Sequence, residues 1–158
     1  MLSQFQLLSQ EAEGRYATDN ELKFVTDYIN SFPLRLQTYQ KVHALESKII
    51  QDAYAKMEAN HPKLLRVGSQ DMRSKWKRDT LRVLRYSAIA LLLDDPDLLQ
   101  ERFLFWFQTI MRAFGTQESC EVTYSLMQEV VKDHLSPIEA ALFCPLLELN
   151  RVALGVTA

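Results

Sequence analysis

The residues with the clearest chemical potential are the run Lys75-Trp76-Lys77-Arg78-Asp79, which sets one acid among three bases. At helical spacing, Trp76, Asp79, Val83 and Tyr86 fall on one face, so a carboxylate stands between two aromatic rings on an otherwise inward face. Burying an acid costs free energy unless a donor meets it. We therefore expect either a ligand with N–H groups or an internal arginine opposite Asp79.

A stripe of guanidinium groups, formed by Arg78, Arg82 and Arg85, lies next to this face. The wider basic cluster from Arg73 to Arg85 fits three descriptions: part of a ligand site, a solvated helix face, or a docking patch for an acidic partner. Nucleic acid is not expected as a partner, because the cluster lacks interleaved exposed aromatic residues and the whole chain has a net charge of -2.

The sequence gives little support for a disulfide, a metal site or an enzyme active site. Cys120 and Cys144 give neither a metal-ligand spacing nor a disulfide framework, and a reducing cytosolic setting is expected. The three histidines, His43, His61 and His134, are too scattered to predict a metal site. There is no nucleophile–base pair and no glycine-rich phosphate loop, so we do not expect an enzyme.

Length and composition predict one all-α domain. The chain has 158 residues, of which 47% are hydrophobic and 24% charged, as in ordinary globular proteins. Its longest apolar run, residues 88–93, is far too short to cross a bilayer, and the N-terminus does not have the pattern of a signal peptide. We therefore expect no membrane insertion.

Apolar periodicity and helix-capping signals predict about eight helices, a number and range of lengths similar to those of a globin. The expected segments are residues 1–14, 18–31, 34–60 with a dividing bend near 43–47, 72–93, 97–114, 116–134 and a last helix from 136. The second of them should turn Leu22, Val25 and Ile29 inward. Residues 63–71 are expected to form a loop, and no hairpin or strand is predicted.

The aromatic run Phe103, Phe105, Trp106 and Phe107 is too dense for one helix face. Core packing explains some of these rings. At least one of them is expected to point into a partner or a pocket.

Motifs in a fixed order carry a family resemblance. They are Glu11 to Leu22, Arg35-Leu36, Ile49-Ile50, Asn60-His61-Pro62, Lys75 with Arg78 and Asp79, Leu84-Arg85 and Phe114-Gly115-Thr116. In order and spacing the chain resembles the phycobiliproteins, the globin-related light-harvesting subunits of phycobilisomes, over essentially its whole length. The resemblance implies a phycobiliprotein-type globin fold in one domain, 1–158.

The resemblance also implies a mode of association. Residues 1–32 are similar to the family's N-terminal helical hairpin, a dimerisation element, and residues 33–158 to its globin body. The candidate interface residues are Phe5, Leu8, Glu11 and Glu13, with one of the acids meeting an arginine of the partner. A homodimer and a pair with a phycobiliprotein-type subunit both fit, whereas the alternative is a hairpin that packs only on its own body.

The chromophore site departs from the family pattern. Chromophore-bearing subunits read K-C-x-R-D, where the cysteine forms a thioether to an open-chain tetrapyrrole, and here Trp76 takes the cysteine position. Covalent attachment at this position is therefore excluded. The loop 132–137, similar to the family's second attachment site, has no cysteine either. Arg82 and Val83 stand where the family tends to have tyrosines.

Two functions follow from this departure. The first is non-covalent binding of a bilin such as phycocyanobilin or biliverdin, for bilin handling, biosynthesis or phycobilisome assembly, in the cytoplasm or at the thylakoid surface. The expected bilin-binding residues are Lys75, Trp76, Arg78, Asp79, Arg82 and Tyr86. Asp79 would accept hydrogen bonds from pyrrole N–H groups, and Arg78 with Lys75 would hold a propionate. The second is a pigment-free scaffold or regulatory subunit in which Trp76 fills the vacated cavity.

Overall fold

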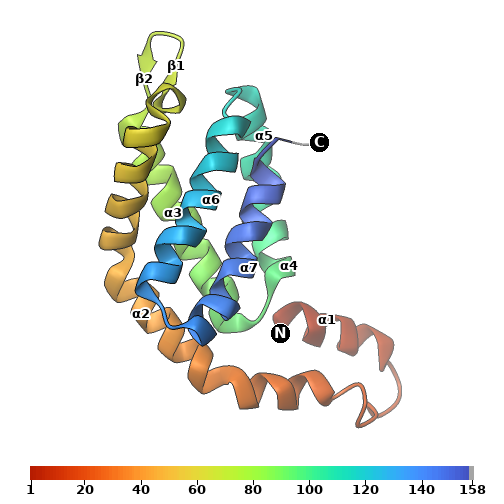
Figure 1. Cartoon of the computed structure of the whole chain (residues 1–158). Helices are drawn as coiled ribbons and strands as arrows, with labels where there is room; N and C mark the ends of the chain where they lie inside the picture. The colour runs from red at the N-terminus through yellow and green to blue at the C-terminus, as the bar shows by residue number, and fades with distance from the viewer. Residues whose placement is uncertain (157–158) are drawn as a thin grey trace.

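The computed structural model describes residues 1–156 as a helical body with an arm that projects from one end (Figure 1). Its elements, in chain order, are α1 (Leu2–Glu11), α2 (Lys23–Asn60), η1 (Pro62–Leu65), β1 (Arg66–Val67), β2 (Gln70–Asp71), α3 (Arg73–Leu93), α4 (Pro96–Leu99), η2 (Gln100–Leu104), α5 (Phe105–Ala113), α6 (Gln117–His134) and α7 (Pro137–Leu154). The predicted all-α, globin-like class is confirmed, with fewer long helices than expected.

Helix α2 is continuous over 38 residues, so the predicted stop near residues 31–33 and the predicted division near 43–47 are both wrong, although the helix curves as it passes from the arm into the body (Figure 1). Pro33 lies inside the helix, where it removes one hydrogen-bond donor. Contacts on both sides of Pro33 hold the helix in place: the Tyr28 hydroxyl donates to the Leu92 carbonyl (3.1 Å), and Arg35 donates to the Leu91 carbonyl (3.0 Å). Tertiary packing here outweighs the local cost of proline.

Residues 63–71 are more ordered than the predicted loop. After the 3₁₀ turn η1, strands β1 and β2 pair antiparallel, with Arg66 opposite Asp71 and Val67 opposite Gln70. Gly68 has a φ of +58°, the left-handed conformation that lets so short a hairpin turn. Two-residue strands carry too little alternation to be predicted from a sequence.

The core lies among α2, α3, α6 and α7, which run side by side in the body (Figure 1). Its fully buried side chains include Ile49 and Met57 of α2, Leu84 of α3, Met127 of α6 and Phe143 of α7. These residues recur at helical spacing, so each helix buries one apolar stripe against its neighbours.

Helix α7 begins as the sequence predicts, with Ser136 as N-cap and Pro137 at the first helical position. Ser136 and Glu139 form a reciprocal capping box. The buried Glu139 carboxylate also accepts a hydrogen bond from Lys41 of α2 (2.8 Å), and this contact, with the bonds from Ser136, lowers the pKa of Glu139 to about 2. One carboxylate thus caps α7 and ties it to α2.

The predicted helix 97–114 consists of α4, the π-helical turn η2 and α5. Phe103 and Phe107 are buried, whereas Phe105 and Trp106 are exposed, which confirms that the four rings do not share one face. No helix within residues 1–156 is long and apolar enough to cross a membrane.

Candidate functional site

Trp76 is buried between three helices. Trp76 lies on α3, and its indole Nε1–H donates a hydrogen bond to the Thr123 hydroxyl of α6 (2.7 Å). The centre of its ring lies 5.8 Å from that of the Tyr54 ring of α2. A buried indole needs a partner for its N–H, and Thr123 supplies it. Trp76 therefore acts as a packed core residue that joins α3 to α2 and α6.

A small cavity remains beside Trp76, with a volume of about 50 Å³. Asp79, Cys120, Thr123 and Tyr124 line one side, and apolar residues such as Phe107 line the other. A cavity that accepts one benzene molecule measures about 150 Å³, and pockets for drug-sized ligands begin at about 300 Å³. The interior beside Trp76 thus has room for water and not for a tetrapyrrole.

Asp79 meets an arginine of its own helix at the rim of this cavity. The Arg78 Nε lies 3.3 Å from the Asp79 carboxylate; the Arg78 side chain is 67% exposed and that of Asp79 is 16% exposed. The pair therefore stands between interior and solvent. Of the two partners expected for Asp79, the structure supplies the internal arginine.

Cys120 lines the same cavity from α6, although the sequence gave no reason to connect it with Trp76. Burial, together with the nearby Asp79 charge, raises the pKa of the Cys120 thiol to about 12. The same two causes, with the neighbouring Cys120, raise the pKa of the Tyr124 hydroxyl. Both groups are protonated at neutral pH, so the thiol lacks the thiolate character that covalent attachment requires.

Two lysines of the run Lys75–Asp79 lie over aromatic rings. The Lys75 Nζ is 3.7 Å from the centre of the Phe114 ring, across the mouth of the cavity, and the Lys77 Nζ is 3.7 Å from the centre of the Tyr54 ring. Such cation–π contacts stabilise partly exposed sites by about 0.5–1 kcal/mol. Lys75 and Phe114 both line the pocket, so this contact narrows it on one side.

The remaining two expected bilin-binding residues lie away from the cavity. Tyr86 stacks on Phe103, with ring centres 4.3 Å apart and an interplanar angle of 17°, and Arg82 points to solvent. Neither lines the cavity beside Trp76. The structure therefore brings together Lys75, Trp76 and Asp79, with Arg78 at the rim, and leaves Arg82 and Tyr86 on the outer face of α3.

The four expected interface residues are all on or just beyond α1, in the arm. Phe5 makes an edge contact with the Phe24 ring of α2 at 5.0 Å and still exposes part of its ring, while Leu8 is half buried. Glu11 and Glu13 are exposed. Helix α1 buries no residue completely, so its apolar side chains remain available for contact.

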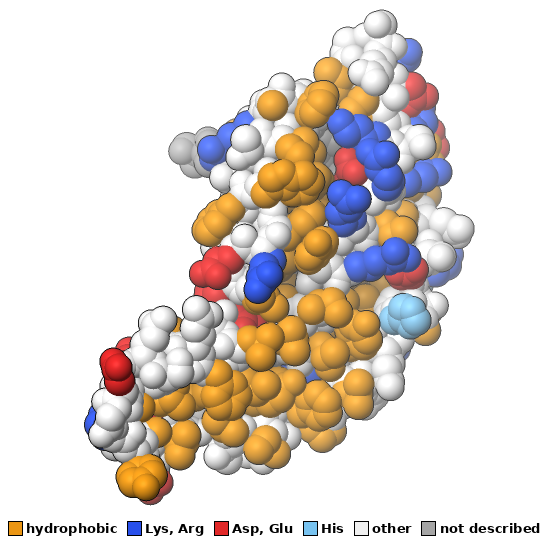
Figure 2. Space-filling view, turned by 180° about the vertical axis from the view of Figure 1, so that it is seen from behind, with side chains coloured by type: hydrophobic (Ala, Val, Ile, Leu, Met, Phe, Trp, Pro, Cys, Tyr) orange, Lys and Arg blue, Asp and Glu red, His pale blue; other side chains and the backbone are white. Residues whose placement is uncertain are grey.

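Leu22 and Ile29 point to solvent, contrary to the prediction that they face inward; Ile29 is 63% exposed. The arm has no second layer to cover them. They belong to a larger set of exposed apolar residues, which we call the arm face: Leu2, Phe5, Leu7, Leu22, Ile29, Phe32 and Ile89. Figure 2 shows an almost continuous apolar surface over the arm and the adjoining part of the body.

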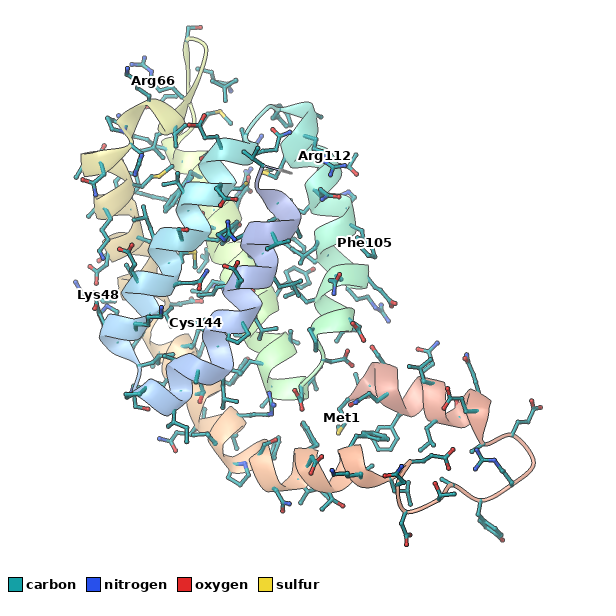
Figure 3. All side chains as sticks on the ribbon, turned by 45° about the vertical axis from the view of Figure 1, so that its right-hand side comes forward. Met1, Lys48, Arg66, Phe105, Arg112 and Cys144 are labelled. Atoms are coloured by element: carbon teal, nitrogen blue, oxygen red, sulfur yellow. The ribbon has the colours of Figure 1, made fainter. Side chains whose placement is uncertain are left out.

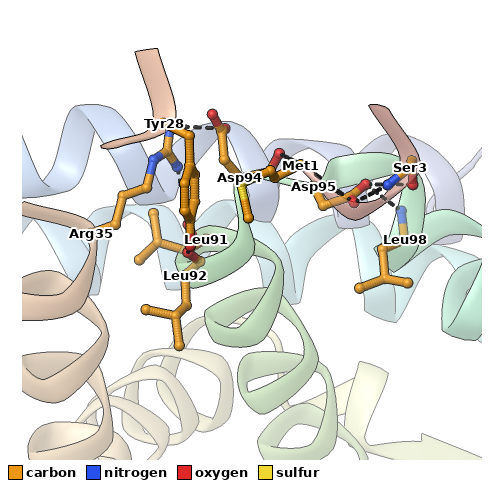
Figure 4. Close-up of polar contacts among 9 residues, drawn as sticks. All are labelled: Met1, Ser3, Tyr28, Arg35, Leu91, Leu92, Asp94, Asp95 and Leu98. Atoms are coloured by element: carbon orange, nitrogen blue, oxygen red, sulfur yellow. Dashed lines mark hydrogen bonds and ion pairs between the residues drawn. The ribbon is translucent and has the colours of Figure 1, made fainter. Parts of the chain in front are cut away.

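The arm is fixed to the body at the junction of α3 and α4 (Figure 4). The buried Asp95 carboxylate accepts hydrogen bonds from the Ser3 backbone N–H and hydroxyl, both 2.8 Å, and from the Leu98 N–H at the start of α4. Next to it, Asp94 pairs with Arg35 of α2 at 2.8 Å. Burial alone would raise the pKa of Asp95, but these hydrogen bonds outweigh it and lower the pKa.

Within residues 1–156, no group of three or more His, Cys, Asp and Glu side chains is placed to hold a metal ion. The arrangement beside Trp76 thus contains neither a nucleophile in its reactive form nor a metal centre. It offers a small, partly open pocket lined by Asp79, Cys120, Thr123 and Tyr124, and the arm offers an open apolar face.

Comparison with known proteins agrees with this architecture. The chain is 28% identical over 128 residues to the allophycocyanin subunit beta-18 of Aglaothamnion neglectum, an alignment that covers 78% of this chain and 75% of that subunit. It is 25% identical over 130 residues to a phycobiliprotein beta chain of Mastigocladus laminosus, covering 79% and 77%. The family model described as "Phycobilisome protein" matches residues 6–154. The chain belongs to the phycobilisome protein family.

Proposed function

We propose that this protein is a pigment-free accessory subunit that associates with phycobiliprotein-type partners through its arm face. It would act as a scaffold or regulator in the cytoplasm, with phycobilisomes at the thylakoid surface. The observation that carries the proposal is the contrast between a chromophore position filled by Trp76 and an arm whose apolar residues are uncovered. A second copy of the chain and another subunit of the family are both candidate partners.

The exposed area supports association. A short helix such as α1 does not persist on its own, and here it buries no residue completely. Contiguous apolar patches of this kind are rare on monomers and typically mark protein interfaces. Phe5, Phe32 and Ile29 provide aromatic and branched side chains that are suited to a desolvated contact. Glu11 and Glu13 at the end of α1 would form its charged rim.

The test compares two matched variants by sedimentation velocity, alone and with an allophycocyanin preparation. Ile29→Asp places a charge in the arm face, and Val152→Asp places one on α7; the two side chains are 63% and 59% exposed. We expect Ile29→Asp to weaken association at least tenfold and Val152→Asp to leave it unchanged. The proposal would be refuted if both variants associated equally well. It would also be refuted if the wild-type protein stayed monomeric both alone and with the allophycocyanin preparation.

A second candidate function is non-covalent bilin binding, favoured by the position of Lys75, Arg78 and Asp79 around the cavity mouth. The volume of about 50 Å³ requires that Trp76 and Phe114 move before a tetrapyrrole could enter. Asp79 would then accept hydrogen bonds from pyrrole N–H groups, with Arg78 and Lys75 on the propionates. Arg82 and Tyr86 would contact only a part of the pigment that extends along the outer face of α3.

This candidate predicts that bound phycocyanobilin or biliverdin loses its red shift in Asp79→Ala. The matched control is Asp71→Ala, because Asp71 in β2 is also paired with an arginine but does not line the cavity. If both variants bind pigment with the wild-type spectrum, Asp79 has no such role. Release of free pigment in acid-urea would establish that the attachment is non-covalent.

A further inference from the structure

Helix α5 carries an aromatic ridge on its outer side. Phe105 is 60% exposed, Trp106 is 54% exposed, and Phe114, just past the helix, is also exposed. Figure 3 shows Phe105 and Arg112 directed away from the body along the same outer edge. Neighbouring Phe107 fills the core, so the exposed rings are not simply surplus core residues. Exposed aromatic rings that gather on one edge mark an interaction surface.

Cations flank this ridge on both sides. Arg102 and Arg112 lie near the two ends of α5, and Arg82 projects from the neighbouring α3; all three are exposed, and no carboxylate among residues 1–156 pairs with them. By contrast, Arg85 of the same helix face is neutralised by Glu46. Figure 2 shows the column of basic side chains beside the apolar stripe.

The charge of the whole chain is strongly segregated along the sequence. Residues 63–85 contain eight Lys and Arg against two Asp, a net charge of +6, while the rest of the chain has ten basic and eighteen acidic residues, a net charge of -8. Within this stretch Arg73, Arg78 and Arg85 are paired with carboxylates, whereas Arg82 has no such partner among residues 1–156. Unpaired cations such as Arg82, Arg102 and Arg112 favour an anionic partner. The exposed acid Glu101 lines one groove with Phe105.

We propose that this aromatic–basic face, formed by Phe105, Trp106, Phe114, Arg82, Arg102 and Arg112, docks on an anionic lipid surface. Aromatic side chains settle at the level of the headgroups, and lysine and arginine side chains bind anionic lipids around them. The unpaired arginines on both sides of the rings match this arrangement. Since no helix within residues 1–156 can cross a membrane, the contact would be peripheral.

The experiment is flotation of the purified protein with vesicles of mixed phosphatidylglycerol and phosphatidylcholine, against vesicles of phosphatidylcholine alone. We expect binding to the anionic vesicles only, and weaker binding as salt is added. Arg82→Gln and Arg112→Gln should each weaken it about fivefold. Trp106→Ser should weaken it about tenfold, because the indole leaves water on binding.

Matched controls separate this face from the rest of the surface. Lys132→Gln removes an exposed cation of α6, and Tyr16→Ser removes a ring in the arm that is 97% exposed; neither should change flotation. The arginine, Lys132 and Tyr16 side chains are exposed, so these variants should unfold at the wild-type midpoint. Trp106 also packs on Phe103 and Phe107, so flotation of Trp106→Ser is measured at a temperature at which circular dichroism shows it folded. Phe105 lines one groove with Leu7 of the arm face, so the two surfaces adjoin, and sedimentation without vesicles reports association through the arm separately.

Three results would overturn the lipid assignment. One is a wild-type protein that does not float with anionic vesicles. Another is binding that the controls weaken as much as the face variants do. The third is a change in sedimentation of the protein with its partners in Trp106→Ser and Arg82→Gln, without any vesicle binding; the face would then be a protein interface.

Discussion

The surroundings of Trp76 and the arm both contain aromatic rings beside ionised groups. Around Trp76 these groups are packed and paired, whereas in the arm many of them are exposed. At Trp76, the indole N–H has a partner in Thr123, the Asp79 carboxylate has Arg78, and the residual cavity is about 50 Å³. In the arm, α1 has no completely buried residue and Ile29 points into solvent. The polar groups around Trp76 have their partners within the chain, whereas the apolar side chains of the arm are left uncovered.

This difference indicates which of the two regions is available to bind a partner. A closed, hydrogen-bonded core region contributes stability, because further binding there must first break existing contacts. An uncovered apolar region costs little to engage, because its burial by a partner removes apolar surface from water. The two regions also differ in what fixes them: Trp76 is held by packing, whereas α1 is held to the body mainly by hydrogen bonds to Asp95.

The largest effect is expected from Trp76→Ala. Removing a buried indole leaves a cavity and an unpaired Thr123, so the free energy of unfolding should fall by about 3–5 kcal/mol. Urea unfolding followed by circular dichroism measures the change. Tyr16→Ala, at the exposed end of the arm, is the control and should change it by less than about 0.5 kcal/mol. A loss below about 1 kcal/mol in Trp76→Ala would show that the region is not closely packed.

A smaller effect is expected from Asp95→Ala, which removes the acceptor for Ser3 and the cap of α4. Hydrogen bonds to a buried carboxylate contribute about 1.5–3 kcal/mol, so α1 should detach while the body stays folded. Hydrogen exchange should become faster in residues 2–11 and remain slow in α6. Unchanged protection of α1 would mean that Asp95 does not anchor it.

The attachment of α1 through Asp95 should weaken at low pH. In the folded protein the pKa of Asp95 lies below its ordinary value of 3.8, because hydrogen bonds from Ser3 and Leu98 outweigh the effect of burial. Its contribution is therefore complete above about pH 4 and is lost as the pH falls through the folded pKa. The backbone N–H resonance of Ser3, followed by NMR during an acid titration, should report this transition. A resonance that moves at or above the ordinary pKa would contradict the assignment.

The sequence predicted the features that depend on local signals and missed those that depend on tertiary contacts. Helix α3 and the Ser136–Glu139 cap were predictable because periodicity and capping are local. Pro33 misled the prediction, since tertiary contacts hold α2 together across it. Filling of the chromophore position by Trp76 was one of two open alternatives. Its partner Thr123 and the nearby Cys120 could not be foreseen, because their proximity depends on how α6 packs against α3.

The smallest effect is expected from Arg78→Ala. The Arg78 guanidinium of this pair is 67% exposed, and ion pairs with an exposed partner contribute about 0–1 kcal/mol. The free energy of unfolding should change by less than about 0.5 kcal/mol in urea, far less than in Trp76→Ala. A large loss would mean that the rim, and not only the indole, holds the region closed.

The measurement that tests the central claim most directly is a titration of the wild-type protein with phycocyanobilin, followed by absorption. Because Trp76 is buried and the pocket beside it measures about 50 Å³, we predict the spectrum of free pigment at every protein concentration. A saturable, sharpened and red-shifted band would contradict the pigment-free assignment. It would mean that Trp76 and Phe114 open to admit a bilin, and that the charged rim of Lys75, Arg78 and Asp79 serves the second candidate function.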